Sequence, residues 1–221
     1  MNEVFRADLY AQLSEFFKEP TEEFADDVAS GRLLCYFKGV FSTLKIDASP
    51  LAGLVVHNDA HNLLRDEYRR LFLGPLSPYI VPVESVYKRW SNDPECKLVI
   101  AGEKGYLMGD PAMDMIKRYQ VHGIVIPYQY SSMPDHIALE LEYMAFLCRN
   151  ALQNEQREFL DSHLDWINSL SDDINEKDNV GFYSTAVEIT GYLINRKRQQ
   201  IGATTLQVRA PFRKGKTVSS L

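Results

Sequence analysis

The sequence has few cysteines and no long apolar run. Its 221 residues include three cysteines, an odd number at wide spacing: Cys35, Cys96 and Cys148. This spacing excludes a disulfide framework and favours a reducing compartment. No stretch approaches the roughly 18 apolar residues that span a bilayer, so we expect no stable membrane insertion. The first residues are acidic where an export signal would be basic and then apolar, so we expect a cytoplasmic protein.

The motifs of common enzyme sites are also missing. There is no GxxxxGK[ST] or GxGxxG loop, because Gly102, Gly105 and Gly109 are wrongly spaced for phosphate binding. No GxSxG elbow surrounds a serine, and no HExxH pair occurs. We therefore expect no cofactor and no catalytic residue set by a local motif, while a Ser/His/Asp set assembled from distant segments stays open.

Acidic residues are missing from the end of the chain, although the formal net charge is -6. The residues before Arg196 include 17 of the 24 basic residues and all 30 acidic ones, a net charge of -13. Phosphate binding needs a basic face on the fold itself, so this distribution argues against a nucleic-acid partner. An acidic body suits a cationic partner better.

What is present is the composition and periodicity of a helical protein. Hydrophobic residues make up 45% of the chain and charged residues 24%, as in ordinary globular proteins. Apolar residues recur at helical spacing, and convincing two-residue alternation is confined to short pieces such as 123–127. We predict an all-α, bundle-like single domain over residues 1–199 and a basic, flexible tail over 200–221. Helices are expected at 3–18, 21–30, 33–44, 49–73, 110–123, 134–148, 155–170 and 179–198.

Two segments rich in proline and glycine interrupt the helices, at 74–109 and 124–133. Loops of such length inside a compact domain are usually functional, and one short helix is expected in the first. The binding cleft is predicted where the two loops meet.

Histidines raise the question of a metal site. His57 and His61 lie four residues apart with Asp59 between them, and two ligands on one helical turn can hold zinc. A solvated helix face is the favoured interpretation, because no accompanying ligand motif is present. His163 lies on an apolar stripe between Phe159 and Trp166 and is expected to be a satisfied core histidine.

Two conspicuous segments flank the expected cleft. One runs from Glu67 to Tyr87, and the other from Met133 to Met144. Pro134 is expected to open a helix with Asp135 in its first turn, where a carboxylate meets unpaired N–H groups. Asp135 and His136 are then either helix-initiating residues alone or, at the rim of a cleft, a carboxylate and an imidazole that meet a cationic peptide.

These segments resemble a known family. The ordered motifs are EYxxLFxGP, PxESVY, GxPxMxxxxxYxxxG, PDHIAxELEYMAxL and FLxxHLxWI, beginning at residues 67, 82, 109, 134 and 159. Together they are similar to the TorD/DmsD/NarJ chaperones that mature molybdenum-cofactor oxidoreductases, over about residues 3–197. The resemblance implies an all-helical fold and a non-enzymatic role.

The resemblance also implies partners. Such chaperones bind the N-terminal twin-arginine signal peptide of the apo reductase catalytic subunit, support cofactor insertion and delay export. A homodimer formed by helix exchange would be compatible with the long 74–109 connection.

The matching motifs imply a set of peptide-binding residues, to which neighbouring aromatics and Glu140 are added on physical grounds. The set is Tyr68, Phe72, Glu84, Ser85, Tyr87, Trp90, Asp135, His136 and Glu140. The alternatives are a helical metal-binding protein or metalloenzyme using His57 and His61, or a structural subunit of a reductase complex.

Overall fold

A computed structural model describes residues 2–56, 59–74 and 79–208, and within these it contains helices and no strand. The all-α prediction is thus confirmed. The α-helices are α1 (Glu3–Glu15), α2 (Glu22–Ala29), α3 (Arg32–Leu44), α4 (Ala60–Tyr68), α5 (Glu84–Tyr87), α6 (Asp110–Val121), α7 (Ile137–Arg149), α8 (Gln153–Ser162), α9 (Ile167–Lys177) and α10 (Phe182–Val208). Three short helices accompany them: 3₁₀ turns η1 (Ser49–Leu54) and η3 (Tyr128–Tyr130), and a π turn η2 (Arg69–Leu73).

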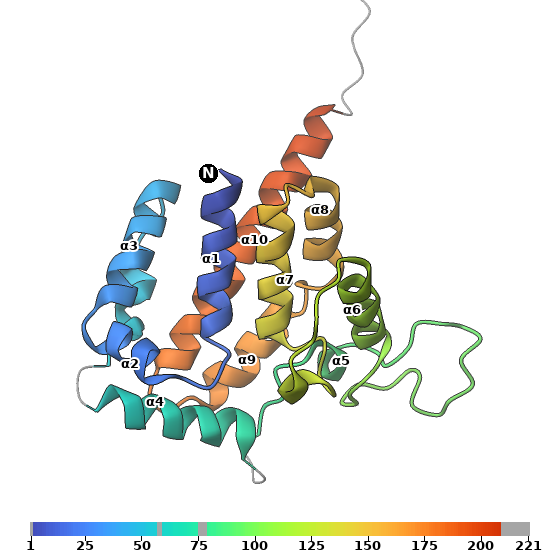
Figure 1. Ribbon diagram of the computed structural model, residues 1–221, viewed down its shortest axis with the longest axis horizontal. Helices are drawn as coiled ribbons and strands as arrows, with labels where there is room; N and C mark the ends of the chain where they lie inside the picture. Colours follow the sequence, from blue (N-terminus) through green and yellow to red (C-terminus); the bar gives the residue numbers. More distant parts are fainter. Residues whose placement is uncertain (1, 57–58, 75–78, 209–221) are drawn as a thin grey trace, which may run out of the picture.

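The long helices form a bundle, and α4 crosses its lower end (Figure 1). α1 packs along α7, and α10 packs against α9 and η1. The end of α4 lies beneath the lower ends of α1 and α7 (Figure 1). No described helix is both long enough and apolar enough to cross a membrane.

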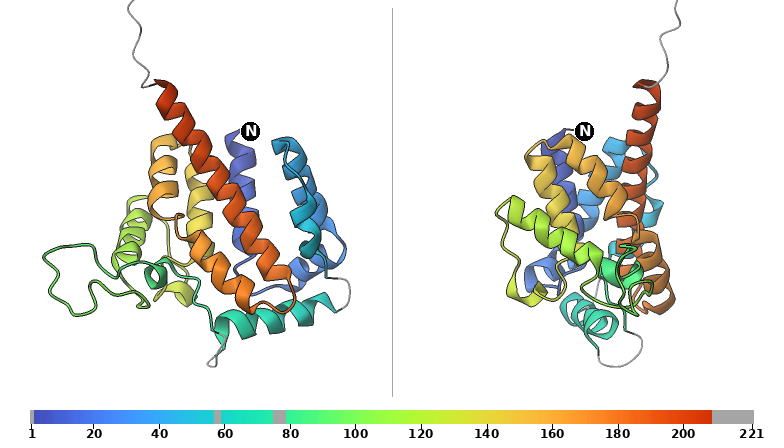
Figure 2. Two further views of the ribbon diagram at one scale, coloured as in Figure 1. Left: turned by 180° about the vertical axis from the view of Figure 1, so that it is seen from behind. Right: turned by 90° about the vertical axis from the view of Figure 1, so that its right-hand side faces the viewer.

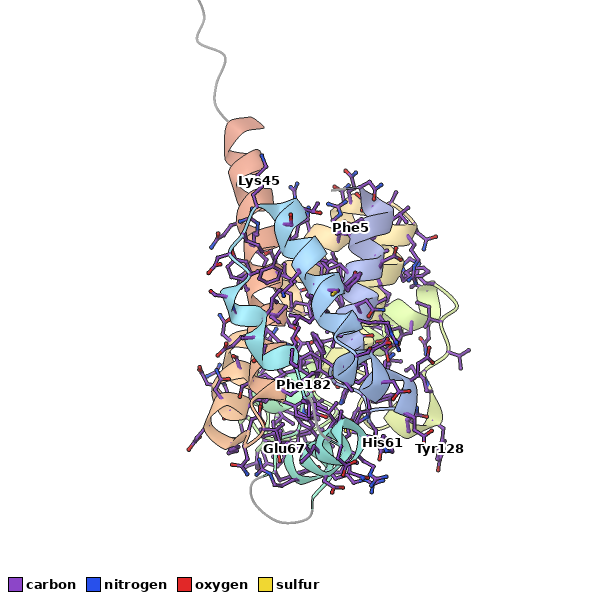
Figure 3. All side chains as sticks on the ribbon, turned by 90° about the vertical axis from the view of Figure 1, so that its left-hand side faces the viewer. Phe5, Lys45, His61, Glu67, Tyr128 and Phe182 are labelled. Atoms are coloured by element: carbon purple, nitrogen blue, oxygen red, sulfur yellow. The ribbon has the colours of Figure 1, made fainter. Side chains whose placement is uncertain are left out.

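Aromatic side chains dominate the core between α1, α3 and α10. Phe16 stacks on Phe37 with ring centroids 5.3 Å apart, and meets Phe182 edge-on at 6.0 Å. All three are buried, and Phe182 lies inside the bundle in Figure 3. Such rings contribute both buried area and preferred pair geometry, so they fix how the helices meet.

Side-chain caps define the starts of the first two helices. The side chains of Asn2 and Thr21 cap α1 and α2 by accepting a hydrogen bond from the backbone N–H three residues on. The prediction of one helix over 49–73 is wrong. η1 ends at Leu54, and α4 begins only after Asp59, which has a left-handed φ of 46°.

The C-terminal half contains another unpredicted break. The helix expected over 155–170 is in fact two, because α8 ends at Ser162 and α9 begins at Ile167. α10 continues to Val208, so the expected tail boundary at 200 falls inside this helix (Figure 2). Residues 209–221 of that tail lie outside the described residues.

The expected loop over 74–109 is present in its described part and contains the short helix α5. Its second half projects from the bundle (Figure 2). Backbone hydrogen bonds close its base, from Trp90 N to the Glu103 carbonyl (2.9 Å) and from Asp110 N to the Trp90 carbonyl (2.7 Å). Gly109 permits this closure, since a Cβ there would lie 2.6 Å from the Trp90 carbonyl oxygen.

We predict that Gly109→Ala lowers the free energy of unfolding by about 1–3 kcal/mol, because backbone atoms must move to admit the methyl group. Gly102→Ala is the matched control in the same loop, where an added Cβ meets nothing within 4 Å. Urea unfolding of both variants measures the difference. Equal stability of the two variants would contradict the close packing at Gly109.

Candidate functional site

The two conspicuous segments meet at a short backbone junction. Val83 and His136 form an isolated antiparallel bridge, and Ile137 N donates to the Pro82 carbonyl at 3.0 Å. α5 and α7 both begin here, so the junction sets where their first residues point. The expected loop 74–109 thus meets the residues that directly follow the expected loop 124–133.

Asp135 joins the segments with its side chain as well. Its carboxylate accepts hydrogen bonds from the backbone N–H of Ser85 (2.8 Å) and from the Ser85 hydroxyl, and its carbonyl accepts from Glu84 N (3.0 Å). Burial raises the pKa of Asp135, although the bonds from Ser85 oppose the rise. The expected position was wrong: α7 begins at Ile137, so Asp135 precedes its first turn, and Asp135 is fully buried rather than exposed at a rim.

Glu84 is the centre of a buried polar network. Its carboxylate lies 2.7 Å from His163 Nδ1 and 2.6 Å from Lys88 Nζ. Burial alone would raise the pKa of Glu84, but His163, Glu140 and Lys88 together hold it below its usual value. We call Glu84, Ser85, Asp135, Glu140 and His163 the Glu84 network.

Glu140 contributes a second buried carboxyl group to this network. It is fully buried, and its Oε2 accepts a hydrogen bond from Trp166 Nε1 at 3.1 Å. Burial and the adjacent Glu84 charge raise the pKa of Glu140 well above its ordinary value. Glu140 Oε1 has no hydrogen-bond partner among the described residues. A proton on this carboxyl group, donated to the carboxylate of Glu84, satisfies both groups.

His163 is a satisfied core histidine, as predicted. Its Nδ1 faces Glu84 and its Nε2 lies 2.8 Å from Asp114 Oδ2. Burial alone would lower the pKa of His163, but hydrogen bonds to Asp114 and Glu84 outweigh it and raise the pKa. Asp114 is also held by Arg118 Nε at 2.6 Å.

Glu84, Glu140 and His163 are the one set of described residues that would offer a metal three ligand atoms, all within 4.8 Å. Hydrogen bonding already accounts for this cluster, because His163 and Lys88 contact the carboxylate of Glu84 and Trp166 donates to Glu140. Of the alternative pair proposed from the sequence, His57 lies outside the described residues, and no metal cluster among the described residues includes His61.

Beside the junction lies an open cleft of about 660 Å³, which we call the central cleft. Tyr68, Phe72 and His136 form buried parts of its wall, while Leu73 and Tyr79 are half-exposed. The π turn after α4 carries both Phe72 and Leu73, and π turns often occur at functional sites. The lining residues are Lys18, Glu19, Tyr68, Phe72, Leu73, Tyr79, Val81, Pro82, Pro127, Gln129, Tyr130, Met133, His136, Leu139 and Glu142.

His136 is uncharged and has a defined tautomer. Its Nδ1 caps α7 by accepting a hydrogen bond from Ala138 N at 3.2 Å. Burial lowers the pKa of His136 to about 3, so the ring is neutral near pH 7. A neutral ring that accepts at Nδ1 carries its proton on Nε2, which has no partner among the described residues. His136 therefore lines the central cleft with an unused N–H donor and not with a positive charge.

The acidic groups of the cleft differ from those predicted. Glu19 and Glu142 line it with half-exposed side chains. Glu142 is paired with Lys18 at 2.5 Å, and Glu19 with Arg69 at 2.9 Å. Glu142 stands within the PDHIAxELEYMAxL motif, so the motif contained it, but only the fold shows that Glu142 faces the cleft and Glu140 the interior.

The other expected residues are divided between two places. Glu84, Ser85, Asp135 and Glu140 belong to the buried network. Tyr87 lies on the α9 side, where its hydroxyl donates to Asp173 (2.8 Å) and its ring stacks on Trp166. The Nε1 of Trp90 donates to the Leu107 carbonyl at 3.0 Å in the projecting loop. The structure thus brings three of the nine residues, Tyr68, Phe72 and His136, to the central cleft.

Residues 47–172 match the model of the nitrate reductase delta subunit family. The match covers more than half of the chain, and the chain belongs to this family. It is 26% identical over 203 residues to the chaperone protein TorD of Photobacterium profundum, covering 83% of this chain and 88% of that protein. The TorD chaperone of Vibrio cholerae is also 26% identical, with 83% and 86% covered.

A solved structure from Archaeoglobus fulgidus, described as a redox enzyme maturation protein, shares the fold. Its TM-score is 0.54 at 22% sequence identity, and the match covers 86% of this chain and 93% of that chain. The family match and the named relatives support a maturation chaperone of the TorD type, a class without enzymatic activity.

The proton on Glu140 gives a testable pH dependence. Since its folded-state pKa is raised, its contribution to stability is complete below the ordinary value of 4.5 and is lost as the pH rises through the raised pKa. We predict that Glu140→Gln, which keeps a donor toward Glu84 without a titrating proton, reduces this loss. The difference in slope between wild type and variant is at most about 1.4 kcal/mol per pH unit.

Urea unfolding from about pH 4.5 to about pH 8 measures both slopes. Glu142→Gln is the control, because it removes a half-exposed acid from the same helix and should leave the slope nearly unchanged. Parallel pH profiles for wild type and Glu140→Gln would contradict a protonated Glu140.

Proposed function

We propose that this maturation chaperone acts in the cytoplasm and binds the N-terminal twin-arginine signal peptide of a molybdenum-cofactor reductase catalytic subunit. The peptide lies in the central cleft, and the apo subunit stays bound until its cofactor is inserted. The observation that carries the proposal is the cleft itself: aromatic walls and two half-exposed acids in one groove of a TorD-type chaperone.

Charge selects the basic part of the peptide. Glu19 and Glu142 present carboxylates to the cleft, and both are already paired with cations, Arg69 and Lys18. An incoming guanidinium exchanges with Lys18 at Glu142, and it binds better than an ammonium because its fork fits a carboxylate with two parallel bonds. The acidic body of the chain assists the encounter at low salt.

His136 donates a hydrogen bond to the main chain of the peptide. Its neutral Nε2–H is a donor, so it suits a peptide carbonyl oxygen rather than an arginine. Tyr68 and Phe72 supply the apolar wall next to it, and they are held by their own contacts, with ring centroids 5.1 Å apart. Recognition thus combines one charge contact, one backbone contact and apolar packing.

The Glu84 network supports the cleft from behind without touching the peptide. Asp135 and Ser85 tie the two segments together, and His136 stands next to Asp135 in the chain. Substitutions in the network are therefore expected to act on stability first and on peptide affinity only through the position of His136. This assigns Glu84, Ser85, Asp135 and Glu140 a positioning role.

We predict that Glu142→Gln weakens binding of a twin-arginine leader about three- to tenfold, because it removes one charged partner of the arginines. The probe is the leader of a molybdenum-cofactor reductase encoded in the same genome, titrated by calorimetry. The effect should shrink at high salt.

Glu176→Gln on α9 is the matched control, since this exposed acid does not line the cleft and should leave affinity unchanged. No binding of such leaders to the wild-type protein, together with undiminished reductase activity after deletion of the gene, would refute the proposed function. Equal losses in both variants would show that only net charge matters.

We predict that two replacements of His136 separate its effect on stability from its effect on leader binding. Asparagine offers an acceptor near the position of Nδ1 and so keeps the cap of α7, but it lacks the donor of Nε2. His136→Asn should keep the fold and weaken leader binding about three- to tenfold. His136→Gln offers a donor near Nε2 but loses the cap, so it should bind more tightly than His136→Asn and unfold more easily.

Calorimetric titration at about pH 5.5 and about pH 7.5 adds a second readout. Because the pKa of His136 is lowered to about 3, its charge does not change over this range. A wild-type affinity that changes with pH, while that of His136→Asn does not, would contradict the neutral donor.

A further inference from the structure

The central cleft continues into a second groove that none of the predicted peptide-binding residues lines. This groove has a volume of about 240 Å³ and shares Pro127, Leu139 and Glu142 with the cleft. Its remaining walls are apolar or aromatic, and they come from the end of α6, the segment after it and α7: Tyr119, Ile124, Val125, Ile126, Tyr143 and Phe146. We call it the side groove.

The segment 124–127 forms one wall of the side groove and has unused binding capacity. Ile124 and Ile126 pack against the core, while Val125 between them is 86% exposed. Neither Val125 nor Ile126 makes a backbone hydrogen bond within the part of the chain that the structure describes. Their main-chain groups are therefore available to an extended peptide, as at the edge of a sheet.

Exposed apolar side chains continue beside this wall. Tyr128 is 91% exposed and projects outward at the margin of the molecule (Figure 3). Val125 and Tyr128, three residues apart, thus both expose apolar surface at or beside the side groove. At 240 Å³ the side groove is smaller than most pockets for small molecules, which measure about 300–1,000 Å³, so it suits a few aliphatic side chains of a peptide.

The acidic residues of the central cleft and the apolar walls of the side groove follow one another, and this order indicates which kind of peptide binds there. Glu142 stands where the two hollows join, and it is the one charged residue among those that line the side groove. A chain that enters with its basic residues at Glu142 and Glu19 therefore meets apolar walls next. An export signal has this order, since its basic residues precede an apolar stretch.

We propose that the side groove binds the apolar stretch of the same peptide whose basic residues lie in the central cleft. This inference rests on the proposed function and adds to it a second subsite with its own specificity, for aliphatic side chains. The peptide then passes along the start of α7, from the central cleft to the side groove, with segment 124–127 beside it.

The test uses two probes and two matched variants. The probes are a full twin-arginine leader and the same leader cut directly after its arginines. Val125→Asp places a charge on the wall of the side groove, and Val121→Asp places the same charge on a valine that is 79% exposed and does not line the groove. Both positions are open to solvent, so both variants should fold as the wild type does, which urea unfolding checks.

We expect Val125→Asp to weaken binding of the full leader by about tenfold, because the apolar stretch must lie against a carboxylate. The cut leader should bind more weakly to the wild type and equally well to all three proteins. Val121→Asp should match the wild type with both probes.

Unchanged affinity of Val125→Asp for the full leader would overturn the second subsite. The proposed function would still stand in that case, provided that the wild type binds the leader and Glu142→Gln weakens it. Failure of the wild type to bind the full leader would instead overturn both.

Discussion

The structure depends on the contact of Asp135 with Ser85. This buried carboxylate binds the backbone and side chain at the start of α5, while its own residue immediately precedes the cap of α7. Two segments 50 residues apart are thereby joined at one point. Because His136 and the π turn of α4 line the hollow beside this junction, a shift of α5 relative to α7 would change the central cleft directly.

The Glu84 network explains how a chain can place so many acids in its interior. Glu84 is balanced by Lys88 and His163, and burial together with the neighbouring charge of Glu84 raises the pKa of Glu140 well above its ordinary value. Breaking one partner of such a cluster is costly, since it leaves a buried charge unpaired. The network therefore holds α5, α7 and the α8–α9 connection in one relative position, and it leaves ligand contacts to the neighbouring residues.

Much of the fold could be predicted from the sequence, but the site only in part. Helical periodicity predicts most of the helices, whereas the left-handed Asp59 that separates η1 from α4 has no clear sequence signal. The motifs identify Asp135, His136 and Glu140 as unusual, but they do not show which of them faces solvent. The burial of these acids depends on His163, which pairs with Glu84 across 79 residues of sequence. A local sequence pattern cannot predict such a distant pair. Conversely Glu19, an ordinary acid in the segment after α1, reaches the central cleft only because α1 packs along α7.

The central claim is that the peptide lies between α1, α4 and the start of α7, and not on the α9 side, where Tyr87 packs, or on the projecting loop that holds Trp90. Photo-cross-linking tests this most directly, with a photoreactive residue placed in a twin-arginine leader beside the arginines and the cross-linked residues identified by mass spectrometry. The account predicts cross-links to the lining of the central cleft, including Tyr79, Tyr130 and Met133. Cross-links concentrated on Tyr87, Trp90 and the loop 92–107 would contradict it.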